Sequence, residues 1–281
     1  MTAGTQMVAV TSNAERQRSR MPRWYRRREA SILSFSGLAA FVIIWQLAAD
    51  LKGLDFTFFF ASPSGIIEAA GKEVQLPRFW DDVATSAWEL LAGSGVALGL
   101  GVPIGLAIGW YRRVGFMFDP WLNFFNALPR IALLPLLVLW LGLGTEMKIA
   151  AVSLGAFFSI VVPTAQGVKT VDRNLLDVGR SMDASQGRIF TSIVLPATVP
   201  YIISGIRIAI GRGLIGVVVA EFYAQTKGIG VIIVKSQQAL NSDRMLFGII
   251  LFTISGILLS YATSLLERRF QKWRPGQDME E

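Results

Sequence analysis

Six apolar runs alternate with polar segments along the chain. They cover residues 31–49, 84–110, 121–143, 148–168, 197–222 and 245–266. A helix needs about 20 predominantly apolar residues to cross the hydrocarbon core of a bilayer, and each run is close to or above this length. Backbone groups in lipid must form hydrogen bonds within their own segment, so we expect every run to be helical. The pattern predicts an all-α integral membrane protein with about six transmembrane helices.

The composition supports insertion into a membrane and removes several kinds of chemistry. Hydrophobic residues make up 52% of the 281 residues and charged residues 17%, whereas a soluble domain carries about 25% charged residues. The chain has no cysteine, which excludes disulfides and thiol chemistry, and no histidine, the commonest general base and metal ligand. The sequence therefore offers no candidate catalytic residue and no candidate set of metal ligands.

The lysines and arginines predict the orientation of the apolar runs. With the N-terminus placed in the cytoplasm, 17 of the 27 basic residues fall in inner segments, seven in outer segments and three within the runs. Because cytoplasmic segments carry the excess of basic residues, we expect cytoplasmic tails at 1–30 and 267–281. A basic region before an apolar run also fits a cleaved signal peptide. However, the run at 31–49 is long for one and lacks a clear cleavage site, which favours a retained first span.

The longest outer segment, residues 50–83, contains the pattern of a short helix. In "SPSGIIEAAGKEV" (62–74), either Ser62 or Ser64 can cap the helix. The apolar face of this helix would consist of Ile66, Ile67, Ala69 and Ala70. Such a helix could lie on the bilayer surface or provide a docking surface for an external partner.

The second apolar run is rich in glycine. Glycines recur at a spacing of four residues, at Gly95 and Gly99 and again at Gly101, Gly105 and Gly109. Small residues at this spacing let two helix backbones approach closely. We therefore expect this run to pack tightly against another helix, either within the chain or across a dimer.

A polar segment at 169–196 separates the fourth and fifth runs on the predicted inner side. Leu175, Val178, Met182 and Ile189 recur at helical spacing and would share one face. The segment is too short and too polar to span a membrane, so we expect one or two short helices with a bend near 183–185. The apolar face could rest on the bilayer surface or in a groove of a cytoplasmic protein.

Several segments together resemble a known family. Residues 177–185, Asp-Val-Gly-Arg-Ser-Met-Asp-Ala-Ser, with Leu195-Pro196 following, resemble the hallmark loop E-A-A-x-x-x-G-A-S and later L-P of the inner-membrane permease subunits of binding-protein-dependent ABC importers. Further similarity lies in "LNFFNALPRIALLPLLVLWLGLG" (122–144), "SGIRIAIGRGLIGVVVAEF" (204–222) and "GIGVII" (228–233). The combination covers residues from about 60 to 270 and is similar to the subgroup that imports nitrate, sulfonates, taurine and related molecules.

Two positions depart from the family pattern. Asp183 replaces the glycine of the hallmark loop, and Glu89 stands where relatives often have arginine. A glycine in the loop suggests a turn with positive φ, and aspartate is among the few other residues that adopt this conformation with a modest penalty. We therefore expect the bend to be retained.

The resemblance implies a type I, MetI-like permease fold within 84–266 in a bacterial cytoplasmic (inner) membrane. The implied partners are a second copy of the permease, a cytoplasmic ABC ATPase dimer, an extracytoplasmic solute-binding protein and membrane lipid, with no nucleic acid. It also implies that the 169–196 loop is a coupling loop. Its candidate ATPase-contacting residues are Asp177, Gly179, Arg180, Met182, Asp183, Ala184, Ser185 and Arg188. The chain has no G-x-x-x-x-G-K-[ST] motif, so ATP and Mg would be bound by the ATPase, and this chain would be neither an enzyme nor the holder of a cofactor.

Charged residues within the runs are the candidates for the translocation pathway. They are Arg130, Arg207, Arg212 and Glu221. Charges at membrane depth usually face a bundle interior or a water-filled cavity, and an excess of arginine would suit an anionic solute. Alternatively, these arginines could bind free carbonyls or reach the membrane surface. A stand-alone secondary transporter or channel is the competing function, although such carriers usually hold acidic residues at mid-membrane and this chain has few.

Overall fold

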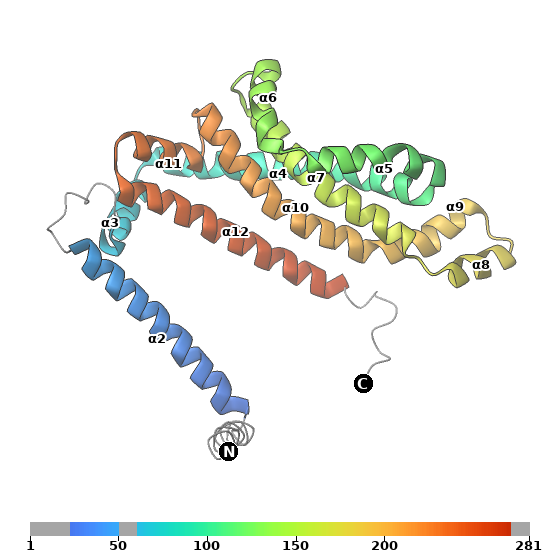
Figure 1. Ribbon diagram of the computed structural model, residues 1–281, viewed down its shortest axis with the longest axis horizontal. Coiled ribbons are helices and arrows are strands. Elements are labelled where there is room, and N and C mark those ends of the chain that lie inside the picture. Colours follow the sequence, from blue (N-terminus) through green and yellow to red (C-terminus); the bar gives the residue numbers. More distant parts are fainter. Residues whose placement is uncertain (1–22, 51–60, 271–281) are drawn as a thin grey trace, which may run out of the picture. The chain divides into compact units, whose positions relative to one another are not determined.

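The structure is a computed structural model that describes residues 23–50 and 61–270. The described residues form helices joined by short turns (Figure 1). In chain order these are α2 (Arg23–Asp50), α3 (Pro63–Val74), α4 (Pro77–Trp110), α5 (Arg112–Ala127), the 3-10 helix η2 (Arg130–Leu133), α6 (Leu134–Leu141), α7 (Thr145–Lys169), α8 (Arg173–Ser181), α9 (Gln186–Ile189), the π-helix η3 (Phe190–Val194), α10 (Leu195–Ala224), α11 (Ile229–Gln238) and α12 (Ser242–Phe270). The all-α prediction is confirmed. Of the predicted tails at 1–30 and 267–281, residues 1–22 and 271–281 lie outside the described residues, and the remainder belongs to α2 and α12.

Within the described residues, five helices are long and apolar enough to cross a membrane. They cover Ile32–Asp50, Pro77–Trp110, Thr145–Lys169, Gln186–Ala224 and Ser242–Leu265. Two of them begin seven or more residues before the predicted runs: α4 starts at Pro77, within the predicted outer segment, and the span Gln186–Ala224 starts within the predicted inner loop. The predicted number of about six is reached if the remaining apolar run counts as one broken span.

The prediction of one span over 121–143 requires a correction. The helix that ends at Ala127 and the segment Arg130–Leu141 meet at 91°. Between them, Leu128 and Pro129 have extended backbone angles, with ψ of 128° and 100°. Proline disfavours the helical conformation of the residue before it and cannot donate a backbone hydrogen bond, so the helix ends here.

The described residues divide into two compact units, one up to Gly65 and the other from Ile66 onward. In the first unit, the Trp45 indole N–H donates to the Ala61 carbonyl at 2.8 Å. The Ser62 hydroxyl accepts the Gly65 N–H at 2.9 Å, which identifies Ser62 as the cap of α3. The predicted apolar face of α3 is only partly buried, because Ile66 is 8% exposed and Ile67 is 74% exposed.

In the second unit, α7 packs between α4 and α10, and α12 packs against α10 and α11 (Figure 1). The α4–α7 contact is unusually close. A Cβ added at Gly93, Gly101, Gly105 or Gly109 would lie within 3.2 Å of Val152, Ile160, Thr164 or Val168, respectively. Successive glycines meet successive residues of α7, so the two helices run parallel with small residues at their contact. The predicted close packing is confirmed for Gly101, Gly105 and Gly109, whereas Gly95 and Gly99 face open space.

Two glycines of α4 form a matched pair for a stability test. A Cβ at Gly105 would lie 2.7 Å from the Thr164 Cβ and 2.8 Å from the Val161 carbonyl oxygen. We expect Gly105→Ala to destabilise the fold by about 1–3 kcal/mol through overpacking. Gly99→Ala should instead be neutral or stabilising by about 0.5–1 kcal/mol, because alanine has a higher helix propensity than glycine. Thermal unfolding of both variants in detergent measures the difference, and equal melting temperatures would refute the close contact.

Candidate functional site

The segment between α7 and α10 folds as a short hairpin of α8 and α9 (Figure 1). Asp172 caps α8 by accepting the Asn174 N–H at 2.8 Å. Ser185 caps α9 by accepting the Arg188 N–H at 3.3 Å. The prediction of two short helices is therefore confirmed, with one difference. Because α9 continues through η3 into α10, the second helix is the start of a long span rather than a separate element.

The turn between α8 and α9 centres on Asp183, which has a φ of 56°. The Asp183 N–H donates to the Arg180 carbonyl at 3.0 Å, and the Ala184 N–H donates to the Gly179 carbonyl at 3.1 Å. This pair of hydrogen bonds forms a Schellman motif, which ends a helix with a left-handed residue. Aspartate thus adopts the positive φ that glycine would supply, and the expected bend is confirmed.

The apolar face predicted for the segment is split by this turn. Leu175, Val178 and Met182, which we call the α8 stripe, are exposed at 46%, 57% and 77% of their surface. Ile189 is 2% exposed, and its Cγ1 lies 3.3 Å from the place where a Cβ on Gly179 would be. The prediction that Ile189 shares the face is wrong, because the chain reverses at Asp183 and folds Ile189 against α8. The remaining stripe is apolar and uncovered in this chain.

The other candidate coupling residues surround the stripe. Gly179 is buried and Ala184 is partly buried. The remaining polar residues are exposed: Asp177, Arg180, Asp183, Ser185 and Arg188. Arg180 and Asp177 form an ion pair at 3.0 Å, and exposed pairs of this kind contribute little to stability. The hairpin therefore presents an apolar stripe with charged neighbours.

A pocket of about 300 Å³ brings together two of the predicted pathway residues, Arg130 and Arg212. Arg130 donates to the Gly155 carbonyl and to the Asn126 side-chain oxygen, both at 2.9 Å. Its guanidinium carbon lies 5.3 Å from the centre of the Phe158 ring. The other walls are mainly aliphatic residues of α6, α7 and α10. Because Gly155 lies roughly 15 Å along α7 from Thr145, the pocket is near the middle of a bilayer-spanning helix.

The structure places the other two pathway candidates elsewhere. Arg207 and Glu221 do not line this pocket. Arg207 is exposed on α10, whereas Glu221, about four turns further along, is completely buried. Of the four predicted pathway residues, only Arg130 and Arg212 therefore line the same pocket.

Glu221 belongs to a group that we call the buried polar cluster: Asp82, Ser86, Glu89, Lys148 and Glu221. The Lys148 ammonium donates to Glu89 at 2.7 Å and to the Lys227 carbonyl at 2.8 Å. Lys148 is 1% exposed and Glu89 is 0% exposed. Lys148 is the first residue of the predicted run at 148–168, and it lies in the first turns of α7 inside the helix bundle.

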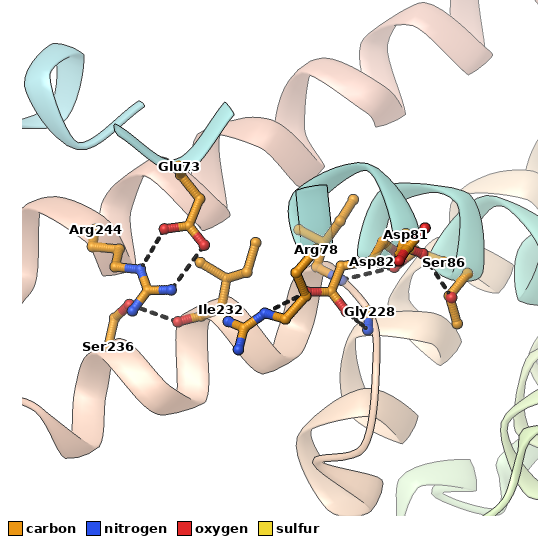
Figure 2. Close-up of polar contacts among 11 residues, drawn as sticks. Glu73, Arg78, Asp81, Asp82, Ser86, Gly228, Ile232, Ser236 and Arg244 are labelled. Carbon is orange, nitrogen blue, oxygen red and sulfur yellow. Dashed lines mark hydrogen bonds and ion pairs between the residues drawn. The ribbon is translucent and has the colours of Figure 1, made fainter. Parts of the chain in front are cut away.

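Two carboxylates and one hydroxyl of the cluster accept hydrogen bonds from the backbone amides at the start of α11. Gly228 N–H donates to Asp82, Ile229 N–H donates to Ser86 and Gly230 N–H donates to Glu221, at 2.9, 2.9 and 2.6 Å. Figure 2 shows the Asp82–Gly228 contact. Gly228 has a φ of 120°, and a Cβ on it would collide with the Glu221 carboxylate. The "GIG" sequence is therefore required by a tight loop around a buried carboxylate.

Ion pairs join further elements next to this cluster. Arg244 of α12 forms a bidentate pair with Glu73 of α3, with both contacts at 2.8 Å (Figure 2). Arg78 lies 3.5 Å from Asp82. On the exposed surface of α3, the Lys72 ammonium lies 2.6 Å from Glu68 and holds the pKa of that carboxyl below its usual range. Sequence reasoning missed this network; the available signal was the presence of Glu89, Lys148 and Glu221 beside or within apolar runs.

The multi-span bundle with its α8–α9 hairpin defines the class of protein as a MetI-like permease of the ABC importer type. A chain of the MetNI methionine ABC transporter in an inward facing conformation shares this fold, with a TM-score of 0.59 and 18% sequence identity over 69% of this chain and 98% of that chain. The chain belongs to the family of binding-protein-dependent transport system inner membrane components, whose model matches residues 101–272. The predictions of fold and family are confirmed.

The curated relatives agree with this family. The chain is 32% identical to SsuC of Escherichia coli, named as an aliphatic sulfonates transport permease protein, over 85% of this chain and 91% of the relative. It is 30% identical to SsuC of Bacillus subtilis over 84% and 85% of the two chains. It is 29% identical to the taurine transport system permease protein TauC of Escherichia coli over 89% and 92%.

Proposed function

We propose that this chain forms the membrane pathway of an importer for a small anionic solute of the sulfonate type. The observation that carries the proposal is the pocket at mid-membrane depth that both Arg130 and Arg212 line. No carboxylate is among the residues of the described chain that line it. A guanidinium group is costly at such depth unless it meets a partner. An anionic solute would supply that partner, and the sulfonate and taurine permeases among the relatives favour this class.

The geometry of the pocket suits a sulfonate. Guanidinium groups donate in a planar fork that matches oxyanions such as carboxylate and phosphate, and a sulfonate presents comparable oxygen atoms. Arg130 is already held by Gly155 and Asn126, so it is positioned before any solute arrives. The aliphatic walls would accommodate the short carbon chain of an alkyl sulfonate. The volume of about 300 Å³ lies at the small end of the usual range for ligand sites.

The proposed assembly follows the family. In it, both termini and the α8–α9 hairpin face the cytoplasm, and the α8 stripe contacts an ATPase subunit. That subunit would bind ATP and Mg²⁺, since this chain lacks the phosphate-binding motif. A second copy of the permease and an extracytoplasmic solute-binding protein complete the importer. The excess of basic residues in the proposed inner segments supports this orientation.

Replacing Arg212 tests the solute pathway. In the complete importer reconstituted into vesicles, we expect Arg212→Gln to lower uptake of radiolabelled taurine or an alkyl sulfonate by about tenfold or more, because one of two charged donors is lost. Arg212→Lys should lower uptake less, since it keeps the charge. The control is Lys235→Gln, which removes a charge from an exposed position of α11. Wild-type uptake by an Arg212→Gln complex that assembles normally would overturn the proposed pathway, and ATP-independent uptake by the permease alone would favour a secondary carrier.

A further inference from the structure

A second cavity, of about 830 Å³, lies between the last turns of α4 and α7 and the α8–α9 hairpin. Three arginines line it: Arg112 and Arg113, which follow α4, and Arg180 of α8. None of the α8 stripe residues lines it, and it shares no residue with the Arg130 and Arg212 pocket. The cavity is therefore distinct from the α8 stripe and from the Arg130 and Arg212 pocket, and it shares one residue, Arg180, with the candidate coupling residues.

The lining residues make the cavity electropositive. No acidic side chain is among them within the part of the chain that the structure describes. Arg180 is paired with Asp177 at 3.0 Å, and the Arg112 guanidinium carbon lies 5.2 Å from the centre of the Phe116 ring. Asp119 lines a smaller pocket together with Arg112. Its carboxylate accepts a hydrogen bond from the Lys169 ammonium at 3.4 Å. Because Asp177 compensates the charge of Arg180, the net positive charge of the cavity comes from Arg112 and Arg113.

The rest of the cavity is apolar and aromatic. Pro103, Leu106 and Ala107 line it along the last two turns of α4. Trp110 and Phe190 meet edge to face with ring centres 5.3 Å apart, and Tyr111 is 58% exposed beside them. Tryptophan and tyrosine collect at the membrane surface, where an apolar ring and a polar tip are both satisfied. An apolar wall that ends in aromatic and basic residues matches a phospholipid, which joins acyl chains to a charged headgroup.

We propose that this cavity binds an anionic phospholipid. Its phosphate would lie against Arg112 and Arg113, and an acyl chain would run along Leu106 and Pro103. A free inorganic phosphate would satisfy the arginines but would leave most of the large apolar wall uncovered. Basic pockets between transmembrane helices at the cytoplasmic side are a known means of holding anionic headgroups. The bound lipid would join the end of α4 to the α8–α9 hairpin.

Lipid retention by the full-length permease tests this proposal without an ATPase or a solute, so its failure is independent of the proposed function. The protein is purified in detergent with phosphatidylglycerol or phosphatidylcholine, and bound lipid is counted by native mass spectrometry. We expect one phosphatidylglycerol per chain in preference to phosphatidylcholine. The double variant Arg112→Gln/Arg113→Gln should weaken retention of phosphatidylglycerol by about tenfold or more, because two charges near the headgroup are lost.

Two further variants separate this site from general charge effects. Arg173→Gln/Arg188→Gln removes the same charge from exposed positions of the α8–α9 hairpin that do not line the cavity, and it should retain the lipid. Gly187→Leu adds a side chain at a lining residue whose Cβ would meet open space, and it should displace the lipid without changing any charge. The variant Gly187→Leu thus tests the site even if the arginine variant is unstable.

Four outcomes would overturn the proposal. They are equal retention by the Arg112→Gln/Arg113→Gln variant, equal retention of phosphatidylcholine, release by millimolar inorganic phosphate, and loss of the lipid when the ATPase assembles. The third would indicate a site for free anions, and the fourth would assign the cavity to the protein interface.

Discussion

Replacing Lys148 with methionine should destabilise the protein by about 3–5 kcal/mol, because it leaves a buried charge without a partner. Lys148 donates to Glu89 at 2.7 Å and to the Lys227 carbonyl at 2.8 Å, and both side chains of the ion pair are almost completely buried. The other carboxylate oxygen of Glu89, Oε2, has no hydrogen-bond partner within the described chain. Lys148→Met would remove the hydrogen bond to Glu89 Oε1, so the carboxylate would lose its ammonium partner while it stays buried. We expect a fall of roughly 10 °C in melting temperature in detergent.

The double variant Lys148→Met/Glu89→Leu separates two quantities. One is the net contribution of the ion pair to the stability of the fold, and the other is the penalty for leaving one partner buried alone. Replacing both members of a buried ion pair with apolar residues of similar volume is often neutral or stabilising. The double variant should therefore unfold well above the temperature of Lys148→Met. Lys169→Met is the matched control, because Lys169 forms an exposed pair with Asp119 at 3.4 Å and should change stability by less than about 1 kcal/mol. If Lys148→Met and Lys169→Met unfold at the same temperature, the buried pair is not formed.

The helices were largely predictable from the sequence because membrane insertion is decided by the length and apolarity of a segment. The exception is informative. The run at 121–143 is long and apolar enough to span, but the extended backbone at Leu128 and Pro129 turns the chain by 91°. The sequence shows the proline but not whether the helix will continue through it, as α4 continues through Pro103 and α7 through Pro163. Tertiary packing decides between a tolerated proline and a break.

Some features of the candidate sites were predictable from the sequence, and others were not. The bend at Asp183 was predictable, because few residues adopt positive φ and the hallmark loop has glycine there. The burial of Ile189 was not, since a helical spacing count assumes that one helix continues through the turn. The meeting of Arg130 and Arg212 depends on α5 and η2 folding back toward α10, which no local pattern encodes. The burial of Lys148 was not predictable, because a lysine at the end of an apolar run resembles a surface residue until its acidic partner on α4 is known.

Introducing a charge into the α8 stripe should prevent assembly with the ATPase. Met182 is the most exposed member of the stripe, at 77%, and its side chain lies at the end of α8 next to the turn. In the proposed importer it would be buried in a groove of the ATPase. An aspartate there would bring an unpaired charge into an apolar contact, a change that costs several kcal/mol. We expect Met182→Asp to lose ATPase co-purification and ATP-driven uptake below detection, while the permease still inserts into the membrane and unfolds at its usual temperature.

Asn174→Asp is the matched control because it adds the same charge to the same short helix, away from the stripe. Asn174 is exposed in the first turn of α8, where a negative charge favours the helix dipole. This variant should therefore copurify with the ATPase and transport normally. If both variants lose the ATPase, the loss reflects the charge of the hairpin rather than burial of the stripe. If Met182→Asp retains the ATPase, the stripe is not the contact surface, and the proposed coupling through α8 has to be abandoned even though the family and the pathway proposal stand.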